Sequence, residues 1–248
     1  MMIKYIILGL LQGMTEFLPV SSSGHLVIMQ RLLGLRGQEV MLIVVLHLGT
    51  LLALAVFFFK DLLGLFSKPK SVLYLAVVSV ITAAIGLGGK DFFEALFTSP
   101  KLVALALMVT GVALLATKRS ASGKKDSVGL KDAVILGFTQ AAAIIPGISR
   151  SGATISTLLF RGIKPEEAFR FSFLAAIPVI LGAALLEFKG INLAFNIDSA
   201  GLAVGFISSF TAGLISLRFL KVVLKKAKLY YFGYYCIAAG AAALLLLR

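Results

Sequence analysis

The chain has 248 residues, of which 59% are hydrophobic and 14% charged, and its mean hydropathy is +1.01. A soluble domain carries about a quarter charged residues, so this chain has too little polar surface to cover a soluble core, and a soluble globular enzyme is excluded. A disordered basic tail is excluded as well, because disordered segments are poor in apolar residues. The net charge of +13, in so apolar a chain, indicates basic loops beside anionic lipid and no nucleic-acid partner.

The first apolar region, residues 3–35, is interrupted at its centre by Leu18-Pro19-Val20-Ser21-Ser22-Ser23-Gly24. Pro, Gly and consecutive Ser break a helix, and each half is shorter than the roughly 20 residues that cross a bilayer. Broken backbone persists at membrane depth only inside the protein or beside a wet cavity. We therefore predict a re-entrant helical hairpin here.

Apolar segments long enough to cross the membrane follow at residues 39–59, 71–89 and 101–117. The basic segment 118–131 is typical of a solvated linker. Residues 132–160 then repeat the interrupted pattern around Pro146-Gly147-Ile148-Ser149-Arg150-Ser151-Gly152, which predicts a second hairpin. Three more spans are expected at 166–187, 199–220 and 229–247.

The two interrupted regions are copies of each other. One constant shift aligns Gln12 with Gln140, Ser21 with Ser149, and Ser23-Gly24 with Ser151-Gly152. A hairpin returns to its own side whereas three spans change side, so the second copy is expected to be inverted. We predict one all-α polytopic membrane domain, residues 1–248, with six transmembrane helices plus two re-entrant helical hairpins in an inverted repeat (repeats of about 1–117 and 132–248). This architecture is typical of secondary transporters, whose site lies near the midplane.

The basic residues predict the orientation. Of the 24 Lys and Arg, seven fall on the side of the N-terminus and fourteen on the other side, and Arg150, Arg170 and Arg218 lie within membrane segments. The richer side is expected to be cytoplasmic. Both termini then face outward, the first hairpin enters from outside, and its site opens to the outer face.

Polar and charged side chains gather in the two hairpins, where they are expensive at membrane depth and indicate function. The first hairpin holds Gln12, Glu16, Ser21, Ser22, Ser23 and His25, and the second holds Ser149, Arg150, Ser151 and Thr154. The two breaks start new half-helices, whose free amides and positive dipole ends favour an anion, and Arg150 suits phosphate oxygens. Glu16 and His25 are residue types that move protons or hold a metal. The pattern predicts a phosphate site with acid and base groups.

Structural roles compete with this interpretation. Ser21, Ser23 and Ser151 could bond only to backbone groups, and Glu16 with Arg150 could be an ion pair that merely joins the repeats. For His47, in the span 39–59, we expect a packing or hydrogen-bonding role. Glu166 and Arg170 are spaced to pair on one helix.

Gln12-Gly13-Met14-Thr15-Glu16-Phe17-Leu18-Pro19-Val20-Ser21-Ser22-Ser23-Gly24-His25 closely resembles the (E/Q)xxxE and Ser-rich motif of the BacA/UppP family, the undecaprenyl-diphosphate phosphatases of bacterial envelopes. Pro146-Gly147-Ile148-Ser149-Arg150-Ser151-Gly152-Ala153-Thr154 resembles its second motif, PGxSRSxxT. The resemblance covers essentially the whole chain, with Gln in place of Glu at position 12 as the family pattern allows.

This resemblance implies an enzyme of the bacterial inner membrane that hydrolyses a polyprenyl diphosphate lipid to the monophosphate and so recycles the carrier for peptidoglycan synthesis. It also implies a contribution to bacitracin resistance. The cofactor that it implies is a divalent cation such as Mg²⁺ or Ca²⁺. Our candidate catalytic residues are Glu16, Ser22, His25 and Arg150. Our candidate substrate-binding residues are Gln12, Ser21, Gly147, Ser149 and Thr154. Glu16 is also the candidate metal ligand.

Several alternatives stay open. The nucleophile could be Ser22 activated by His25 or Glu16, it could be His25, or water could attack directly. A transporter or lipid flippase is the rival function, because broken helices in inverted repeats are common there. A membrane scaffold would leave the hairpin charges without a purpose. The oligomeric state is also open, with a homodimer among the alternatives.

Overall fold

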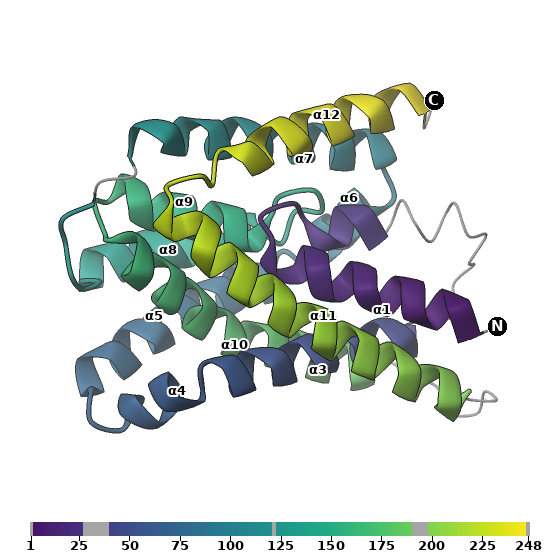
Figure 1. Cartoon of the computed structure of the whole chain (residues 1–248), viewed down its shortest axis with the longest axis horizontal. Helices are drawn as coiled ribbons and strands as arrows, with labels where there is room; N and C mark the ends of the chain where they lie inside the picture. The colour runs from purple at the N-terminus through teal and green to yellow at the C-terminus, as the bar shows by residue number, and fades with distance from the viewer. Residues whose placement is uncertain (1, 27–39, 121–122, 190–197, 247–248) are drawn as a thin grey trace.

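The computed structural model describes residues 2–26, 40–120, 123–189 and 198–246 (Figure 1). Within these ranges the fold is helical and has no named strand; a single bridge joins Lys125 and Ile163. The helices are α1 Met2–Phe17, α3 Val40–Phe57, α4 Phe59–Leu65, α5 Pro69–Gly88, α6 Lys90–Phe97, α7 Pro100–Ala116 with the 3-10 turn η1 Thr117–Arg119, α8 Leu130–Ala142, α9 Arg150–Phe160, α10 Pro165–Lys189, α11 Ser199–Lys225 and α12 Tyr231–Leu246.

Four described helices are long and apolar enough to cross a membrane. They are α5, α7 with η1, α10 and α11, which confirms the spans predicted at 71–89, 101–117, 166–187 and 199–220. Figure 1 places the N-terminus and the C-terminus at the same end of the molecule. The chain is therefore a multi-pass membrane protein.

The span predicted at 39–59 is not one straight helix. The chain bends by 72° between α3 and α4, at Phe58, whose φ of −99° and ψ of 18° lie outside the helical region. Phe58 is buried and its ring packs 5.5 Å from Phe169 and 6.0 Å from Phe173. Packing of this ring against α10 accompanies the bend, a tertiary contact that hydropathy does not reveal. The span predicted at 229–247 is the 16-residue helix α12, shorter than a full crossing.

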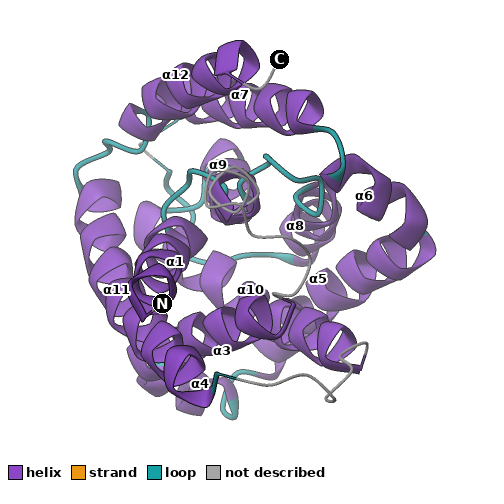
Figure 2. Cartoon of the chain, turned by 90° about the vertical axis from the view of Figure 1, so that its right-hand side faces the viewer, coloured by secondary structure: helices purple, strands orange, loops and turns teal. Residues whose placement is uncertain are grey.

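The described parts of the two interrupted regions consist of short helices. In the second region, α8 has 13 residues and α9 has 11, and the backbone between them is not helical. In the first region, α1 ends at Phe17 and residues 22–26 are helical again; the rest of its second half lies outside the described residues. Figure 2 shows α9 near the centre of the molecule, with α7 and α12 along one side.

Small residues let two helix pairs lie in close contact (Figure 1). On α1, a Cβ added to Gly13 would lie 2.7 Å from the Cβ of Ala212 on α11. On α7, a Cβ added to Gly111 would lie 2.8 Å from the carbonyl oxygen of Gly233 on α12. Close backbone approach of this kind holds helices together where the surroundings are as apolar as the side chains.

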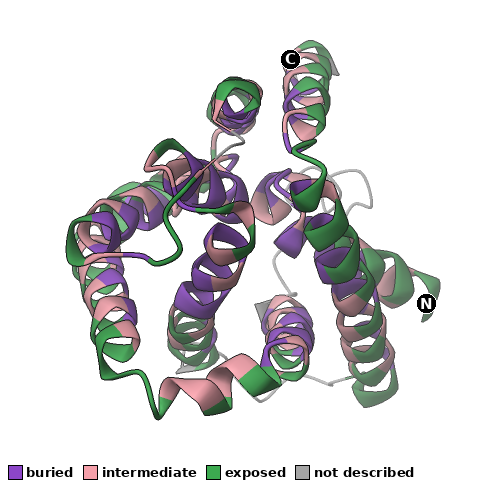
Figure 3. Ribbon diagram, turned by 60° about the vertical axis from the view of Figure 1, so that its left-hand side comes forward, coloured by how far each residue is buried: buried purple, intermediate pink, exposed green. Residues whose placement is uncertain are grey.

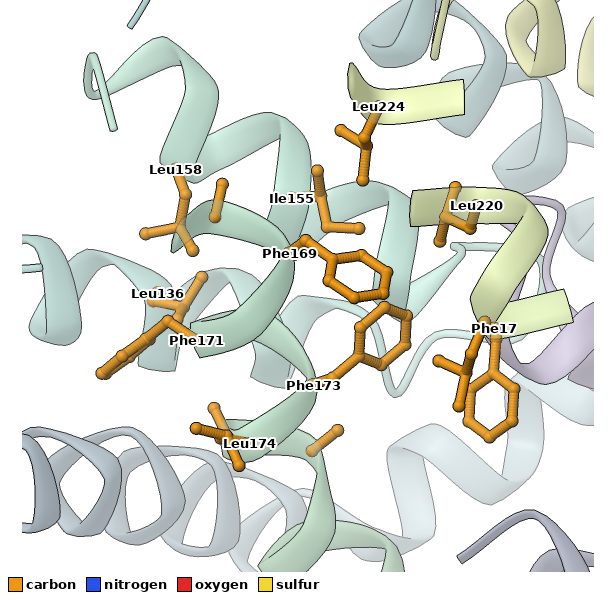
Figure 4. Packing of buried hydrophobic residues seen from close by; sticks show 14 of the residues in the cluster. Phe17, Leu136, Ile155, Leu158, Phe169, Phe171, Phe173, Leu174, Leu220 and Leu224 are labelled. Carbon is orange, nitrogen blue, oxygen red and sulfur yellow. The ribbon is translucent and has the colours of Figure 1, made fainter. Parts of the chain in front are cut away.

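The core lies at the centre of the helices and is rich in phenylalanine. Buried residues line the inward faces and exposed apolar residues the outward ones (Figure 3). Phe169 and Phe173 of α10 lie between Phe17 of α1 and Ile155 of α9 (Figure 4), and the rings of Phe17 and Phe173 meet edge to face at 5.6 Å. The core therefore joins the two hairpins, and it supports the side chains described next.

Ion pairs fix the ends of α8, α9 and α10. Asp132 accepts a hydrogen bond from Arg161 Nε at 2.7 Å and another from the Gly129 amide at 3.2 Å. Burial favours the neutral carboxyl, but these bonds outweigh it and hold the pKa of Asp132 below its usual value. Arg170 pairs with Glu167, through two bonds of 2.8 Å. The pairing predicted with Glu166 was therefore wrong.

Candidate functional site

The two breaks share one hydrogen-bond geometry. In the first, Ser21 Oγ accepts the Gly24 amide at 3.4 Å and lies 3.3 Å from Ser23 Oγ. The same contacts recur at the aligned positions Ser149, Gly152 and Ser151, at 3.1 and 3.3 Å. Ser21 and Ser149 thus cap the half-helices that follow them, and Ser151 Oγ also donates to the carbonyl of Leu18 at 3.3 Å. The structural role considered for these serines is present.

Backbone conformation at the breaks is unusual. Ser21 has a φ of +68° and Gly147 a φ of +96°, and a left-handed conformation is uncommon for a residue with a side chain. Gly147 also lies against α7, because an added Cβ would come within 2.9 Å of Ala106 Cβ. Thr110 of α7 donates to the Gly147 carbonyl at 3.1 Å, and its hydroxyl accepts the Ser149 amide at 3.0 Å. The second break is thereby fixed on α7.

Glu16 is the centre of a polar cluster formed by both hairpins. Its Oε1 accepts a hydrogen bond from Arg150 Nη2 at 2.5 Å. Its Oε2 accepts from Ser22 Oγ at 2.8 Å and from Gln12 Nε2 at 3.1 Å. The Glu16 side chain is 7% exposed and that of Arg150 15%. The structure thus brings together four residues that the sequence singled out. Two of them, Gln12 and Arg150, are 138 positions apart in the chain.

Arg150 retains a free hydrogen-bonding edge. Its Nη1 is buried and has no partner among the described residues, and its guanidinium faces the ring of Phe173 at 5.9 Å. Buried donors are nearly always paired, so this donor is available to bind a ligand. Gln12 Oε1 is also unpaired, but so is the carbonyl of its repeat counterpart Gln140. The free Arg150 donor is therefore the more specific sign of an anion site.

His25 does not face the Glu16 carboxylate. Its Nδ1 lies 2.8 Å from the carbonyl oxygen of Ser21, and its Nε2 lies 2.7 Å from the hydroxyl of Tyr235 on α12. The two rings are stacked, with centroids 5.7 Å apart. Tyr235 was not predicted from the sequence, because no hydrophobic periodicity connects two positions that are 210 residues apart.

His47 lies on α3. What the sequence did not indicate is its position beside Glu16: its Nε2 lies 4.0 Å from Glu16 Oε2. Its Nδ1 bonds the Ile43 carbonyl at 2.9 Å, which agrees with the hydrogen-bonding role expected for it. A histidine within an apolar span was the available signal, because such residues are costly there.

Thr154 lies deeper among the helices. Its hydroxyl donates to the Arg150 carbonyl at 2.8 Å and lies 2.6 Å from Ser172 Oγ, and it is fully buried. These contacts fix α9 on α10. Contact of Thr154, Ser149, Gly147 or Ser21 with a substrate stays a prediction.

Clustered His, Cys, Asp and Glu side chains of the described residues do not by themselves supply a set of metal ligands. The described residues contain no group of three or more His, Cys, Asp and Glu side chains arranged to hold a metal ion. Glu16 is the one carboxylate that bonds within its cluster, and its partner Arg150 would repel a cation. A divalent cation would need further ligands.

Comparison with known proteins gives a consistent result. A family model described as "Bacitracin resistance protein BacA" matches residues 5–242. A protein of Carboxydothermus hydrogenoformans named undecaprenyl-diphosphatase is 43% identical over 97% of this chain and 95% of its own length. One of Korarchaeum cryptofilum with the same name is 40% identical over 98% of both chains. An undecaprenyl-diphosphatase 2 of Bacillus thuringiensis is 38% identical over 99% of this chain and 97% of its own.

Proposed function

The chain belongs to the BacA family, and on this premise we propose that it is an integral membrane phosphatase. It hydrolyses undecaprenyl diphosphate to undecaprenyl phosphate and inorganic phosphate, which makes the lipid carrier available again for cell-wall synthesis. The observation that carries the proposal is the cluster of Glu16, Ser22 and Arg150. It offers a hydroxyl bonded to a carboxylate beside a buried guanidinium whose Nη1 has no partner in the described part of the chain.

We propose Ser22 as the nucleophile. Its hydroxyl already donates to Glu16, a carboxylate that can take its proton, whereas the ring nitrogens of His25 lie against the Ser21 carbonyl and the Tyr235 hydroxyl, away from Glu16. Ser22 Oγ attacks the terminal phosphorus and its proton passes to Glu16. The bond from that phosphorus to the bridging oxygen breaks, and its electron pair leaves with undecaprenyl phosphate. Arg150 and the amides of the breaks offset the charge that develops on the phosphoryl oxygens.

Water completes the cycle by attacking the phosphoserine. The bond between Ser22 Oγ and phosphorus breaks, and the serine oxygen regains the proton held by Glu16. One proton of the water passes to His25 and the other stays on the released phosphate. Ser22 and His25 are three residues apart in the helical segment 22–26, so they lie on one face of it.

The cation implied by the family resemblance is proposed to bind mainly to the diphosphate oxygens of the substrate. Mg²⁺ commonly uses one or two carboxylates together with substrate phosphates, and Glu16 is the available carboxylate. Calorimetry is expected to show no Mg²⁺ or Ca²⁺ binding to the protein alone. Binding in the absence of a diphosphate would contradict this assignment.

We further propose the full inverted-repeat arrangement of six spans and two hairpins. Its support is the packing of helices that are equivalent in the two repeats: α1 and α8, α5 and α11, and α7 and α12. Helix α1 packs on α11, and in the same way α8 packs on α5. Helix α7 packs on its equivalent α12. The termini face outward in this proposal, and the site opens to the outer face. Cysteines placed at Lys90 and Lys118 in a Cys236→Ser background test it, since an impermeant maleimide should label only the former in intact cells.

The experiment that tests the function uses purified protein in detergent, without any gradient, and a prenyl diphosphate. We expect release of inorganic phosphate, near-complete loss of release in Glu16→Gln, and normal release in Glu94→Gln, which alters an exposed carboxylate on α6. Lipid movement in sealed vesicles without phosphate release would favour the transporter or flippase instead.

A further inference from the structure

Tyr235 differs from the other tyrosines at the start of α12. The ring of Tyr230 contacts those of Tyr231 and Tyr234, and Tyr230 and Tyr231 lie near lysines, as is usual for residues at a membrane interface. Tyr235 instead directs its hydroxyl to His25 in the first hairpin. The next residue, Cys236, donates to the carbonyl of Pro19 in the same break at 3.4 Å. The start of α12 is therefore docked on the first break at two consecutive positions.

One of the two contacts of His25 fixes the position of a ring proton. A backbone carbonyl only accepts, so the bond from Nδ1 to the Ser21 oxygen requires a proton on Nδ1. In the neutral ring Nε2 then holds the lone pair, and the Tyr235 hydroxyl donates to it. The planes of the two rings are nearly parallel, 11° apart, so the tyrosine hydroxyl meets Nε2 close to the plane of the imidazole. Tyr235 thus holds the basic nitrogen of His25 in one place.

We propose that Tyr235 is a positioning residue for His25 in the reaction assigned above, on which this inference rests. It holds the imidazole with Nε2 as the free base until the attacking water replaces the tyrosine hydroxyl at that nitrogen. The proton of the water then passes to Nε2, and the imidazole returns it to bulk water before Tyr235 binds again. Tyr235 itself neither gains nor loses a proton in the cycle.

The competing interpretation is that the Tyr235 hydroxyl only satisfies its own hydrogen-bonding need. Tyr235 is 47% exposed, and a tyrosine hydroxyl in apolar surroundings generally finds a partner. The two interpretations differ in their effect on catalysis. A positioning residue changes kcat, whereas a hydroxyl that only satisfies itself leaves kcat unchanged; the Nε2 signal of His25 reports in either case whether the contact exists.

The test compares Tyr235→Phe with Tyr234→Phe, a matched control one residue away that is 55% exposed. For Tyr235→Phe we expect kcat to fall about 2- to 13-fold, the range for one lost hydrogen bond of about 0.5–1.5 kcal/mol, with KM unchanged. Tyr234→Phe should match the wild type. The thermal midpoint of each variant shows whether folding is intact.

Nitrogen NMR gives a readout independent of activity. The chain has two histidines, so a His47→Gln background leaves the His25 ring alone in the spectrum. We expect Nδ1 to appear protonated and Nε2 unprotonated, with the Nε2 signal moving to that of an unbonded nitrogen in Tyr235→Phe. An unchanged kcat or an unchanged Nε2 signal in Tyr235→Phe overturns the inference. Absence of phosphate release by the wild type overturns the proposed function, and this role with it, even where the nitrogen shift shows that the contact exists.

Discussion

Arg150→Lys separates two tasks that the guanidinium performs together. Nη2 of Arg150 bonds Glu16, while Nη1 has no partner among the described residues. A lysine keeps the charge but has a single nitrogen, which cannot hold the carboxylate and reach the phosphate from the same two positions. One charge-assisted hydrogen bond is therefore lost, and such bonds contribute about 1.5–3 kcal/mol. We expect kcat/KM for phosphate release to fall about 10- to 150-fold, since 1.4 kcal/mol corresponds to about tenfold.

The assay is phosphate release from a prenyl diphosphate in detergent, with thermal unfolding measured in parallel. Arg218→Lys makes the same chemical change at an exposed position on α11 and should leave both quantities unaltered. Arg150→Ala should also destabilise the fold, because it leaves the buried Glu16 carboxylate without its cation. An Arg150→Lys protein that is folded and within twofold of wild-type kcat/KM would refute the role of the free guanidinium edge.

Three further predictions follow from single contacts. Ser22→Ala should lower phosphate release at least 100-fold, as expected when a covalent nucleophile is removed, whereas Ser23→Ala should retain most of the activity. Equal rates of phosphate release by the Ser22→Ala and Ser23→Ala variants would exclude covalent attack by Ser22. Gly13→Ala should lower the free energy of unfolding by about 1–3 kcal/mol through overpacking against α11, while Gly64→Ala, where nothing lies within 4 Å of the new Cβ, should not destabilise; thermal midpoints in detergent decide between them. In the folded protein the pKa of Asp132 lies below its usual value of 3.8. Its contribution to stability is therefore complete above pH 3.8 and is lost as the pH falls through the lower folded pKa. Asp132→Asn should be less stable than wild type at pH 7, and a difference in stability that persists unchanged to pH 2 would contradict the shift.

Much of the fold could be predicted because the bilayer restricts what an apolar chain can do. The positions of α5, α7, α10 and α11 followed from hydropathy alone, and the break around Ser149 from its proline, glycine and serine content. The bend at Phe58 could not be predicted, because it accompanies ring packing against a helix more than 100 residues away in sequence.

Some residues of the candidate site could likewise be predicted from the sequence, and others could not. Glu16, Ser22 and Arg150 were identifiable because ionisable and polar groups are costly at membrane depth. Tyr235 and the proximity of His47 to Glu16 were not, because each depends on how α12 and α3 approach the first hairpin. The two contacts of the Ser21 carbonyl and hydroxyl likewise depend on a left-handed backbone that composition does not indicate.

The final helix of each half supports the break of the other half. Thr110 of α7 binds the second break, and Cys236 and Tyr235 of α12 bind the first. In the inverted-repeat arrangement proposed above, neither half builds this centre from its own residues, and a half-length chain would have to pair with a second copy to do so. Such a pair would carry two equal centres. Two copies joined in one chain are free to differ, and here the carboxylate at position 16 lies in one and the guanidinium at position 150 in the other, which leaves a single asymmetric centre.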